Sequence, residues 1–292
     1  MTIAIFGSPY PEHFKKYIQH LIKKLDAEHV KLIVEENFYI FLQKNMRLSS
    51  RIETFKSYLD LQSNVDLMFS IGGDGTLLKA VTYVRKSNIP IMGINTGRLG
   101  FISSISAGQI DDAINDILKK KYSINERTLL ELKTDKNLFK DKNFALNEVA
   151  VSKKDTSSMI RIDAYIQDEF LNTYWADGLV VSTPTGSTGY SLSCGGPIIM
   201  PGTNNIIITP NAPHNLNVRP IVVNDDSVIK LKVEDRDQLA LVSLDSRSRA
   251  FDSGTELIIK KADFKIQLIQ PQNNSFTSTI RNKLMWGLDK RS

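Results

Sequence analysis

The feature that most constrains this chain is an apolar segment that breaks into glycines. Val65 to Ile71 is mostly apolar, Gly72, Gly73 and Gly75 follow it, and apolar residues then return at helical spacing. A nearly continuous apolar strand is typical of a parallel sheet covered on both faces, and glycines let the backbone bend sharply and approach a ligand. The stretch therefore predicts strand, tight turn and helix, and the exposed N–H groups of such a turn can bind a phosphate.

Asp74 lies inside this glycine turn. A carboxylate among N–H groups that face an anion would repel the anion, so Asp74 needs a separate role. It either accepts a proton, binds a metal, or caps the helix that we expect to begin near Thr76. The turn alone leaves these roles open.

The composition excludes several classes of protein. A length of 292 residues fits two domains, and the single cysteine, Cys194, excludes an internal disulfide and agrees with a reducing compartment. The net charge is +5, but lysine and arginine are interleaved with acids, so we expect no nucleic-acid partner. No apolar run approaches the ~20 residues that span a bilayer, and the N-terminus lacks signal-peptide features. We therefore expect no membrane partner and a cytoplasmic location.

Residues 1–121 alternate strands with helices, which predicts a parallel, doubly wound sheet and a Rossmann-like α/β domain. A second glycine-punctuated loop, Asn95 to Phe101, follows one strand at its carboxyl end, where open α/β sheets bind ligands. The expected strands cover 2–6, 30–34, 67–71 and 89–94. The expected helices cover 14–25, 38–61 with a break inside it, the residues after Thr76, and 110–118.

From about Tyr122 the hydrophobic period drops to two, as in Met159 to Ile166, and short strand-like runs follow one another. This pattern predicts an all-β domain over residues 122–270. Residues 271–292 carry apolar positions at helical spacing and form a tail that we expect to return to the first domain. The other expected strands are 129–132, 145–151, 179–182, 206–209, 228–233, 239–244 and 256–260.

The run from Asp177 to Pro197 is the densest group of glycines and hydroxyl residues in the chain. An apolar strand again leads into a glycine-rich loop, and its hydroxyls and N–H groups can bind sugar hydroxyls or phosphates, while Tyr190 offers a flat ring for stacking. The alternative is an ordinary surface loop rich in serine, threonine and glycine.

Asn147 and Glu148 interrupt an otherwise apolar strand. Successive strand residues face opposite sides, so one side chain faces a ligand and the other braces the chain, unless a bulge turns both the same way. The alternative is an edge strand whose polar side chains are solvated.

No Gly-x-x-x-x-Gly-Lys-[Ser/Thr] motif and no His-Arg-Asp loop occurs, so a phosphoryl-transfer function cannot depend on a P-loop or a protein-kinase fold. The sequence instead resembles the NAD kinases over nearly its whole length. The resemblance lies in Gly-Gly-Asp-Gly-Thr at 72–76, Asn-Glu at 147–148, the 177–197 run, Pro213 to Val222, and Ser243 to Ser246.

This resemblance implies transfer of the ATP γ-phosphoryl group to the 2′-hydroxyl of the adenosine ribose of NAD, which gives NADP, with a divalent cation, Mg²⁺ being expected. It also implies a Rossmann-like N-terminal domain, a β-sandwich-like C-terminal domain, and a homodimer or homotetramer joined through the β domains.

The resemblance further implies roles for single residues. Asp74 would be the base, Gly75 and Lys79 would flank the pyrophosphate, Asn147 and Glu148 would hold the NAD, and Asp177 would lie at its nicotinamide side. The adenosine side would contact Thr188, Tyr190 and Ser193, and the remaining expected substrate-binding residues are Trp175, Gly189, Ser191, Ala212 and Arg247. Relatives commonly carry alanine at position 189, glutamine or a similar residue at 247, and sometimes a basic residue at 175.

Two other functions fit parts of the sequence. Lipid kinases of the diacylglycerol or sphingosine type share the 72–76 motif, although the hydroxyl-rich 182–193 loop suits a polar ligand better than an acyl chain. A non-catalytic NAD-binding sensor is the second alternative, and the presence of Asp74 argues against it.

Overall fold

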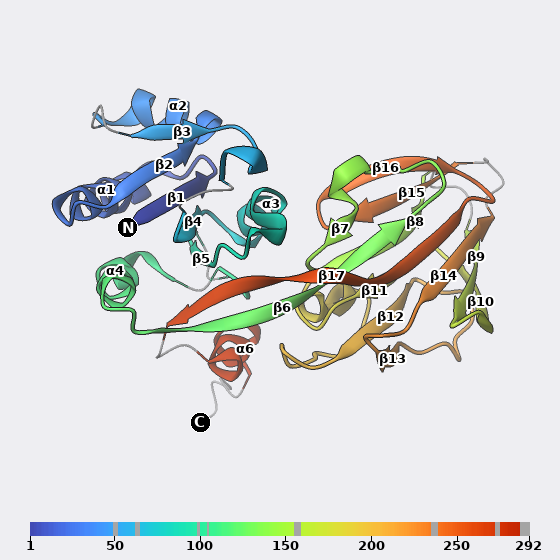
Figure 1. The fold of residues 1–292 in the computed structure, drawn as a ribbon. Helices are drawn as coiled ribbons and strands as arrows, with labels where there is room; N and C mark the ends of the chain where they lie inside the picture. The colour runs from blue at the N-terminus through green and yellow to red at the C-terminus, as the bar shows by residue number, and fades with distance from the viewer. Residues whose placement is uncertain are drawn as a thin grey trace. The chain divides into compact units, whose positions relative to one another are not determined.

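The computed structural model describes residues 1–48, 52–61, 65–97, 100–103, 105–154, 159–234, 239–271 and 275–286. The chain forms two compact units, which Figure 1 follows from the N-terminus to the C-terminus. Unit 1 comprises Met1–Glu126 and Ile266–Ser292, and unit 2 comprises Arg127–Lys265. Among the described residues, no helix is long and apolar enough to cross a membrane.

Unit 1 contains a parallel sheet in the order β17-β5-β4-β1-β2-β3, where β17 contributes only its last part. Residues 67–71 of β4 are all buried, as the apolar run predicts. The strands of this unit are β1 (Thr2–Gly7), β2 (Lys31–Glu35), β3 (Glu53–Phe55), β4 (Leu67–Ile71), β5 (Ile91–Ile94), the start of β6 (Tyr122–Lys133) and the end of β17 (Glu256–Pro271).

Helices cover both faces of this sheet. Ile3 and Ile5 of β1 belong to one apolar cluster with helices α1 and α4, whereas Phe6 packs its ring on Tyr83 of α3, at 5.0 Å between centroids. The helices are α1 (Lys15–Ala27), α2 (Glu36–Asn45), α3 (Asp74–Val84), α4 (Ile110–Leu118) and α6 (Phe276–Leu284), with short 3₁₀ helices at Glu12–Phe14, Tyr58–Leu61, Arg85–Ser87 and Ala107–Gln109.

The segment expected to be helical over 38–61, with a break inside it, is helical only in its first part and in the 3₁₀ turn Tyr58–Leu61. Helix α2 begins at Glu36, because the buried Glu35 carboxylate accepts the Phe38 N–H at 2.9 Å, and the chain is extended again at Met46. Residues Glu53–Phe55 then add β3 to the sheet edge, and this strand is too short to show a period of two.

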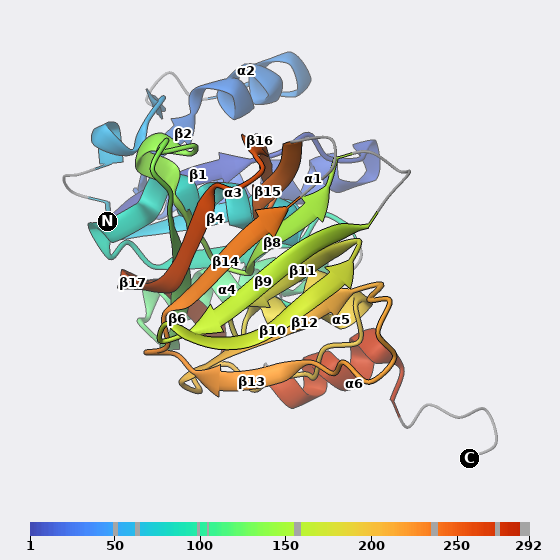
Figure 2. The same ribbon diagram turned by 90° about the vertical axis from the view of Figure 1, so that its right-hand side faces the viewer.

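Unit 2 is a β sandwich. One sheet pairs β10, β9, β14 and β17 antiparallel, as Figure 2 shows for β14, β9 and β10, and the other runs β13-β12-β11-β8-β15-β16. Apolar residues of both sheets share one core. The remaining strands are β7 (Phe144–Ala145), β8 (Glu148–Lys153), β9 (Ile160–Ile166), β10 (Glu169–Ala176), β11 (Gly178–Ser182), β12 (Asn205–Asn211), β13 (Ile221–Asn224), β14 (Ile229–Glu234), β15 (Leu239–Leu244) and β16 (Arg247–Asp252), with helical turns at Lys140–Lys142, Gly186–Thr188 and α5 (Tyr190–Ser193).

The strand expected over 145–151 is divided. β7 ends at Ala145, β8 begins at Glu148, and Leu146 and Asn147 between them are in neither strand. This break determines how Asn147 and Glu148 are presented.

Candidate active site

Asp74 is the first residue of α3, and it does not cap the helix. The N-cap residue is Gly73, with no side-chain cap bond, so the cap interpretation is wrong. The half-buried Asp74 carboxylate instead reaches the loop after β5. Its Oδ2 accepts the Phe101 N–H at 2.8 Å, and its Oδ1 accepts those of Ile102 at 3.2 Å and Ser103 at 2.8 Å. The two glycine loops predicted from sequence are thus joined by one carboxylate.

Glycines make this contact possible. A Cβ at Gly100 would lie 1.9 Å from Asp74 Oδ1, and a Cβ at Gly72 would lie 2.2 Å from the Thr76 hydroxyl. Gly73 and Gly75 differ, because no described atom lies within 4 Å of where their Cβ atoms would be. The turn therefore packs tightly on one side and leaves its backbone open on the other.

Two serines that the sequence analysis did not single out brace the turn. Ser8, just after β1, lies 2.9 Å from the Thr76 hydroxyl, and the Ser103 hydroxyl donates to the Gly72 carbonyl at 3.1 Å. Lys79 is exposed on α3. Serine hydroxyls in loops are too common for sequence alone to distinguish these two.

In unit 2, Asn147 and Glu148 face the same place. A Cβ at Gly189 would lie 3.0 Å from Glu148 Oε2 and 3.2 Å from Asn147 Nδ2, so both side chains reach this glycine. The break between β7 and β8 thus turns both residues the same way. Asn147 Oδ1 and Glu148 Oε2 are buried without a hydrogen-bond partner in the described part of the chain.

The environment of Glu148 favours its protonated form. Burial raises the pKa of the Glu148 carboxyl to about 8, the charge of Asp245 adds to this, and a hydrogen bond from the Tyr190 backbone opposes it. Burial also raises the pKa of Asp245, against backbone hydrogen bonds and the Arg247 charge. A buried carboxyl whose Oε2 has no hydrogen-bond partner and whose pKa is raised is typical of a functional site.

Much of the hydroxyl-rich loop is used internally. The Thr183 hydroxyl donates to the Leu146 carbonyl at 2.6 Å, and those of Ser187 and Thr188 donate to carbonyls three residues earlier. The Ser191 hydroxyl is fully buried and lies 2.9 Å from that of Thr209. Its side chain therefore packs the loop on β12 rather than facing solvent.

Tyr190 remains accessible. Its ring is 40% exposed, and its hydroxyl accepts a hydrogen bond from Asn211 Nδ2 at 2.9 Å. Asn211 precedes Ala212, whose φ is 46°. No sequence pattern indicates that Asn211 orients the tyrosine. Ser193 is the last residue of the short helix α5 that begins at Tyr190.

The residues expected near the nicotinamide lie at the end of β10. Trp175 is 50% exposed, and its carbonyl accepts the His214 N–H at 2.8 Å. Asp177 forms an ion pair of 2.7 Å with Lys153, a partner that the sequence analysis did not identify.

Arg247 is engaged with the main chain. Its guanidinium donates to the carbonyls of Lys142 and Phe144, just before the break in the strand, and lies 3.9 Å from the Asp245 carboxylate. In this arrangement Arg247 supports the chain that leads to Asn147, and its role in substrate binding stays a prediction.

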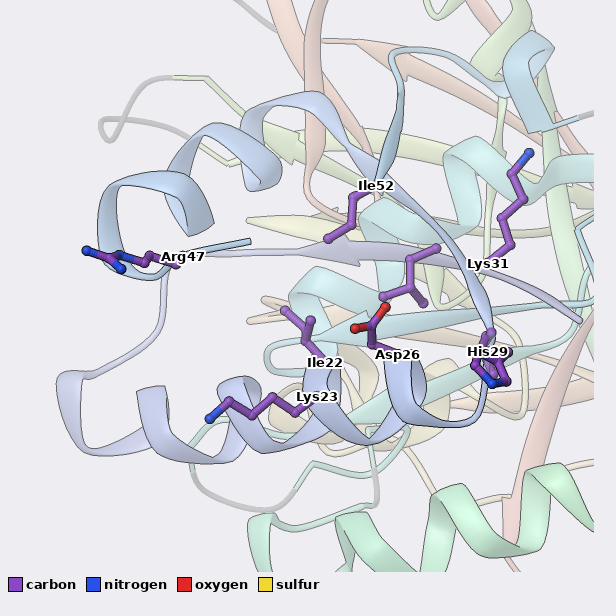
Figure 3. Close-up of a pocket in the computed structure, with 9 residues that line it drawn as sticks. Ile22, Lys23, Asp26, His29, Lys31, Arg47 and Ile52 are labelled. Carbon is purple, nitrogen blue, oxygen red and sulfur yellow. The ribbon is translucent and has the colours of Figure 1, made fainter. Parts of the chain in front are cut away.

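A cavity of about 410 Å³ lies elsewhere in unit 1. It includes Lys31, the first residue of β2, which pairs with Thr2 at the amino end of β1, whereas Gly72 follows the carboxyl end of β4. Figure 3 shows Lys23 and Arg47 pointing away from Asp26, so these cations do not converge on one ligand. No group of three or more His, Cys, Asp or Glu residues able to hold a metal occurs in the described ranges.

Comparisons with known proteins identify relatives that match both parts of the chain. The model of the ATP-NAD kinase N-terminal domain matches residues 3–122, and that of the C-terminal domain matches residues 146–271. A protein of Cytophaga hutchinsonii named NAD kinase is 49% identical over 293 residues, and one of Flavobacterium psychrophilum is 48% identical over 294, with 100% of both chains covered in each case.

Solved structures are similar too. An NAD kinase from Archaeoglobus fulgidus in complex with ATP has a TM-score of 0.76 at 25% identity and covers 98% of this chain and 99% of that chain. Yeast NADH kinase complexed with NADH has a TM-score of 0.88 at 24% identity, and the match covers 99% of this chain and 89% of that chain. The predicted fold class, an α/β domain followed by a β-rich domain, is confirmed.

Proposed function

The chain belongs to the NAD kinase family, and we propose that Asp74 accepts the proton of the reacting hydroxyl while Asn147 and Glu148 hold the NAD. The enzyme transfers the γ-phosphoryl group of ATP to the 2′-hydroxyl of the adenosine ribose of NAD, which gives NADP. The predictions of family, enzyme class and reaction are therefore confirmed. The lipid kinase and the non-catalytic sensor are excluded by full-length relatives named NAD kinase.

The observation that carries the role of Asp74 is its unused hydrogen-bonding capacity. A carboxylate has about four lone-pair positions. Three backbone N–H groups occupy both positions on Asp74 Oδ1 and one of the two positions on Oδ2. One position on Oδ2 is left, on a side chain that is only half-buried at the open turn. The three donors fix the direction of that lone pair, so a ribose hydroxyl placed against it would give up its proton without rearrangement of the loop.

A divalent cation takes part in this family, and we propose that it is Mg²⁺ and that it arrives with ATP. Mg²⁺ is usually held by one or two carboxylates together with substrate phosphates rather than by a protein cage. The open N–H groups of the turn can hold those phosphates, while the one open lone-pair position of Asp74 is kept for the ribose hydroxyl. The cation would neutralise phosphate charge when bound.

Asn147, Glu148 and Tyr190 have the groups needed to hold the acceptor. Two unpartnered oxygens, Asn147 Oδ1 and Glu148 Oε2, can accept hydrogen bonds from ribose hydroxyls. Tyr190 lies next to Glu148, because its N–H bonds the Glu148 carboxyl, and its side chain is exposed. Asp177, Trp175, Thr188, Ser193 and Ala212 are proposed to complete this side, and Gly75 and Lys79 the phosphate side.

We also propose a homodimer or homotetramer joined through unit 2. Strand β13 ends the six-stranded sheet with Val222 43% exposed, and exposed edges of this kind are usually covered. Light scattering at micromolar concentration tests it. A cytoplasmic location is proposed because the enzyme uses ATP and NAD and has a single cysteine.

The test of the site compares Asp74→Ala with Asp66→Ala. Asp66 is a matched control, because it lies in the same unit and its carboxylate also accepts a backbone N–H, that of Thr2 at 2.7 Å, at the other end of β4. With Mg-ATP and NAD as substrates and the products separated, we expect turnover of Asp74→Ala to fall by ~10²–10⁴-fold and that of Asp66→Ala to stay near wild type. A folded Asp74→Ala enzyme with near wild-type turnover would show that another group takes the proton.

A further inference from the structure

We infer that Asp245 is a positioning residue of the NAD site, whose carboxylate holds the break between β7 and β8 so that Asn147 and Glu148 present both side chains on one side. The inference rests on the roles proposed above for Asn147 and Glu148. Asp245 lies in the 243–246 family pattern, which by itself assigns it no role.

Three consecutive N–H groups converge on this carboxylate. Asp245 Oδ1 accepts the N–H of Asn147 at 2.8 Å and that of Glu148 at 3.3 Å, and Oδ2 accepts that of Leu146 at 3.1 Å. The Asp245 N–H returns a bond to the Glu148 carbonyl at 3.0 Å. The side chain is 3% exposed, so these contacts are made away from solvent.

Ladder pairing alone could not supply these bonds. The ladder of β8 with β15 ends at Val149 and Leu244, and Asp245 is the next residue of the β15 chain. In a regular strand, successive N–H groups and side chains point to opposite sides. Buried N–H groups that leave the ladder need another acceptor, and one carboxylate provides it for three residues at once. Asp245 therefore makes the same-side presentation of Asn147 and Glu148 possible.

The charge of Asp245 provides a separate way to test its role, through the titration of Glu148. Glu148 is faced by Asp245 from the β15–β16 turn and by Tyr190 and Cys194 from α5 and its end, and Arg247 lies beyond Asp245. Asparagine at 245 would keep its carbonyl oxygen for Asn147 and Glu148, lose the bond to Leu146, and remove the charge next to Glu148. A residue that only stabilises unit 2 would not alter the titration of Glu148.

The experiment measures the Michaelis constants for NAD and ATP, and kcat/KM for NAD against pH, in wild type, Asp245→Asn, Asp245→Ala and Asp163→Asn. Asp163 is the matched control, since it is a largely buried acid of unit 2 that bonds Thr173 and Arg161. We expect Asp245→Asn to raise KM for NAD about tenfold, as loss of roughly one buried hydrogen bond implies, with KM for ATP within about twofold. The acidic limb of kcat/KM should move to lower pH, because the pKa of Glu148 falls when the neighbouring charge is removed.

Two outcomes would overturn the inference. One is a folded Asp245→Asn enzyme with unchanged KM for NAD and an unchanged acidic limb, while Glu148→Gln alters both. If Glu148→Gln also alters neither, the proposed role of Glu148 itself fails. If the Asp245 variants do not fold, amide hydrogen exchange of the wild-type enzyme decides. The amides of residues 146–148 must exchange as slowly as those of the neighbouring strand β8. Rapid exchange of these amides contradicts the inference.

Discussion

Asp74 in unit 1 and Asp245 in unit 2 make the same kind of hydrogen-bonded contact with the backbone, but they differ in their exposure to solvent. Each carboxylate accepts three consecutive backbone N–H groups, of residues 101–103 and of residues 146–148. Asp74 is half-buried at a turn whose glycines have open space beside them, whereas the Asp245 side chain is 3% exposed with Arg247 nearby. In unit 1 these hydrogen bonds orient a carboxylate that a substrate can reach. In unit 2 they hold the break between β7 and β8 from a buried position.

The carboxylates nearest the two critical glycines also differ. Asp74 beside Gly100 is held by three donors, but Glu148 Oε2 beside Gly189 has no partner among the described residues. The Glu148 carboxyl is held only by the bond from the Tyr190 N–H, so it yields to an added atom more easily than the Asp74 carboxylate does. This contrast predicts unequal effects of the same substitution at the two glycines.

Among three further substitutions, Gly100→Ala is expected to have the largest effect. The new Cβ would lie 1.9 Å from Asp74 Oδ1, so either the carboxylate or the loop must move by about an ångström. Misplacement of a reacting group by that distance costs on the order of 10²-fold in rate. Steady-state turnover is the measurement, and Gly108→Ala is the control, because no described atom lies within 4 Å of its Cβ position. Equal activity of the two variants would show that the Asp74 geometry does not matter.

An intermediate effect, on stability, is expected for Glu148→Gln. The pKa of Glu148 is raised from 4.5 to about 8 in the folded protein. The contribution of this group therefore lowers the free energy of unfolding as pH rises from about 4.5 to about 8, and it stays constant above that pH. Glutamine has no charge to bury. The variant should therefore melt higher than wild type, by an amount that grows across this window and then levels. Thermal melts from pH 5 to 9 measure it, with the exposed Glu169→Gln as control. A difference that shrinks with rising pH would contradict the burial argument.

The smallest effect is expected for Gly189→Ala. Its Cβ would lie 3.0 Å from Glu148 Oε2 and 3.2 Å from Asn147 Nδ2, and a shift of a few tenths of an ångström at a free side-chain end relieves both contacts. We expect KM for NAD to change by less than about threefold, which is under ~0.7 kcal/mol. A loss as large as that of Gly100→Ala would mean that Glu148 is held as firmly as Asp74.

The sequence predicted those parts of the fold and site that depend on neighbouring residues. The strand, turn and helix around Asp74 follow from local pattern, and so does the change to period two near Tyr122, where the continuous strand β6 begins. The edge strands β3, β10, β13 and β16 were missed, because exposed edges carry no clear apolar alternation.

Contacts between residues that are far apart in the sequence could not be predicted. The bonds of Asp74 span 27–29 residues and those of Asp245 span 97–99, and nothing in either local sequence names the partner loop. The hydroxyl-rich loop shows the same limit, since its composition predicts a polar surface but not that Ser191 faces the sheet while Tyr190 faces solvent.

The most direct test of the difference between the two aspartates compares Asp74→Asn with Asp245→Asn in one assay. The substitutions are matched, because each replaces a carboxylate oxygen that accepts a single N–H, of Phe101 or of Leu146, by an amide group that cannot accept it. We expect Asp74→Asn to lose ~10²–10⁴-fold in kcat, and most of the loss for Asp245→Asn to lie in KM for NAD. Folded variants whose losses fall in the same parameter, or an Asp74→Asn enzyme with wild-type kcat, would contradict it.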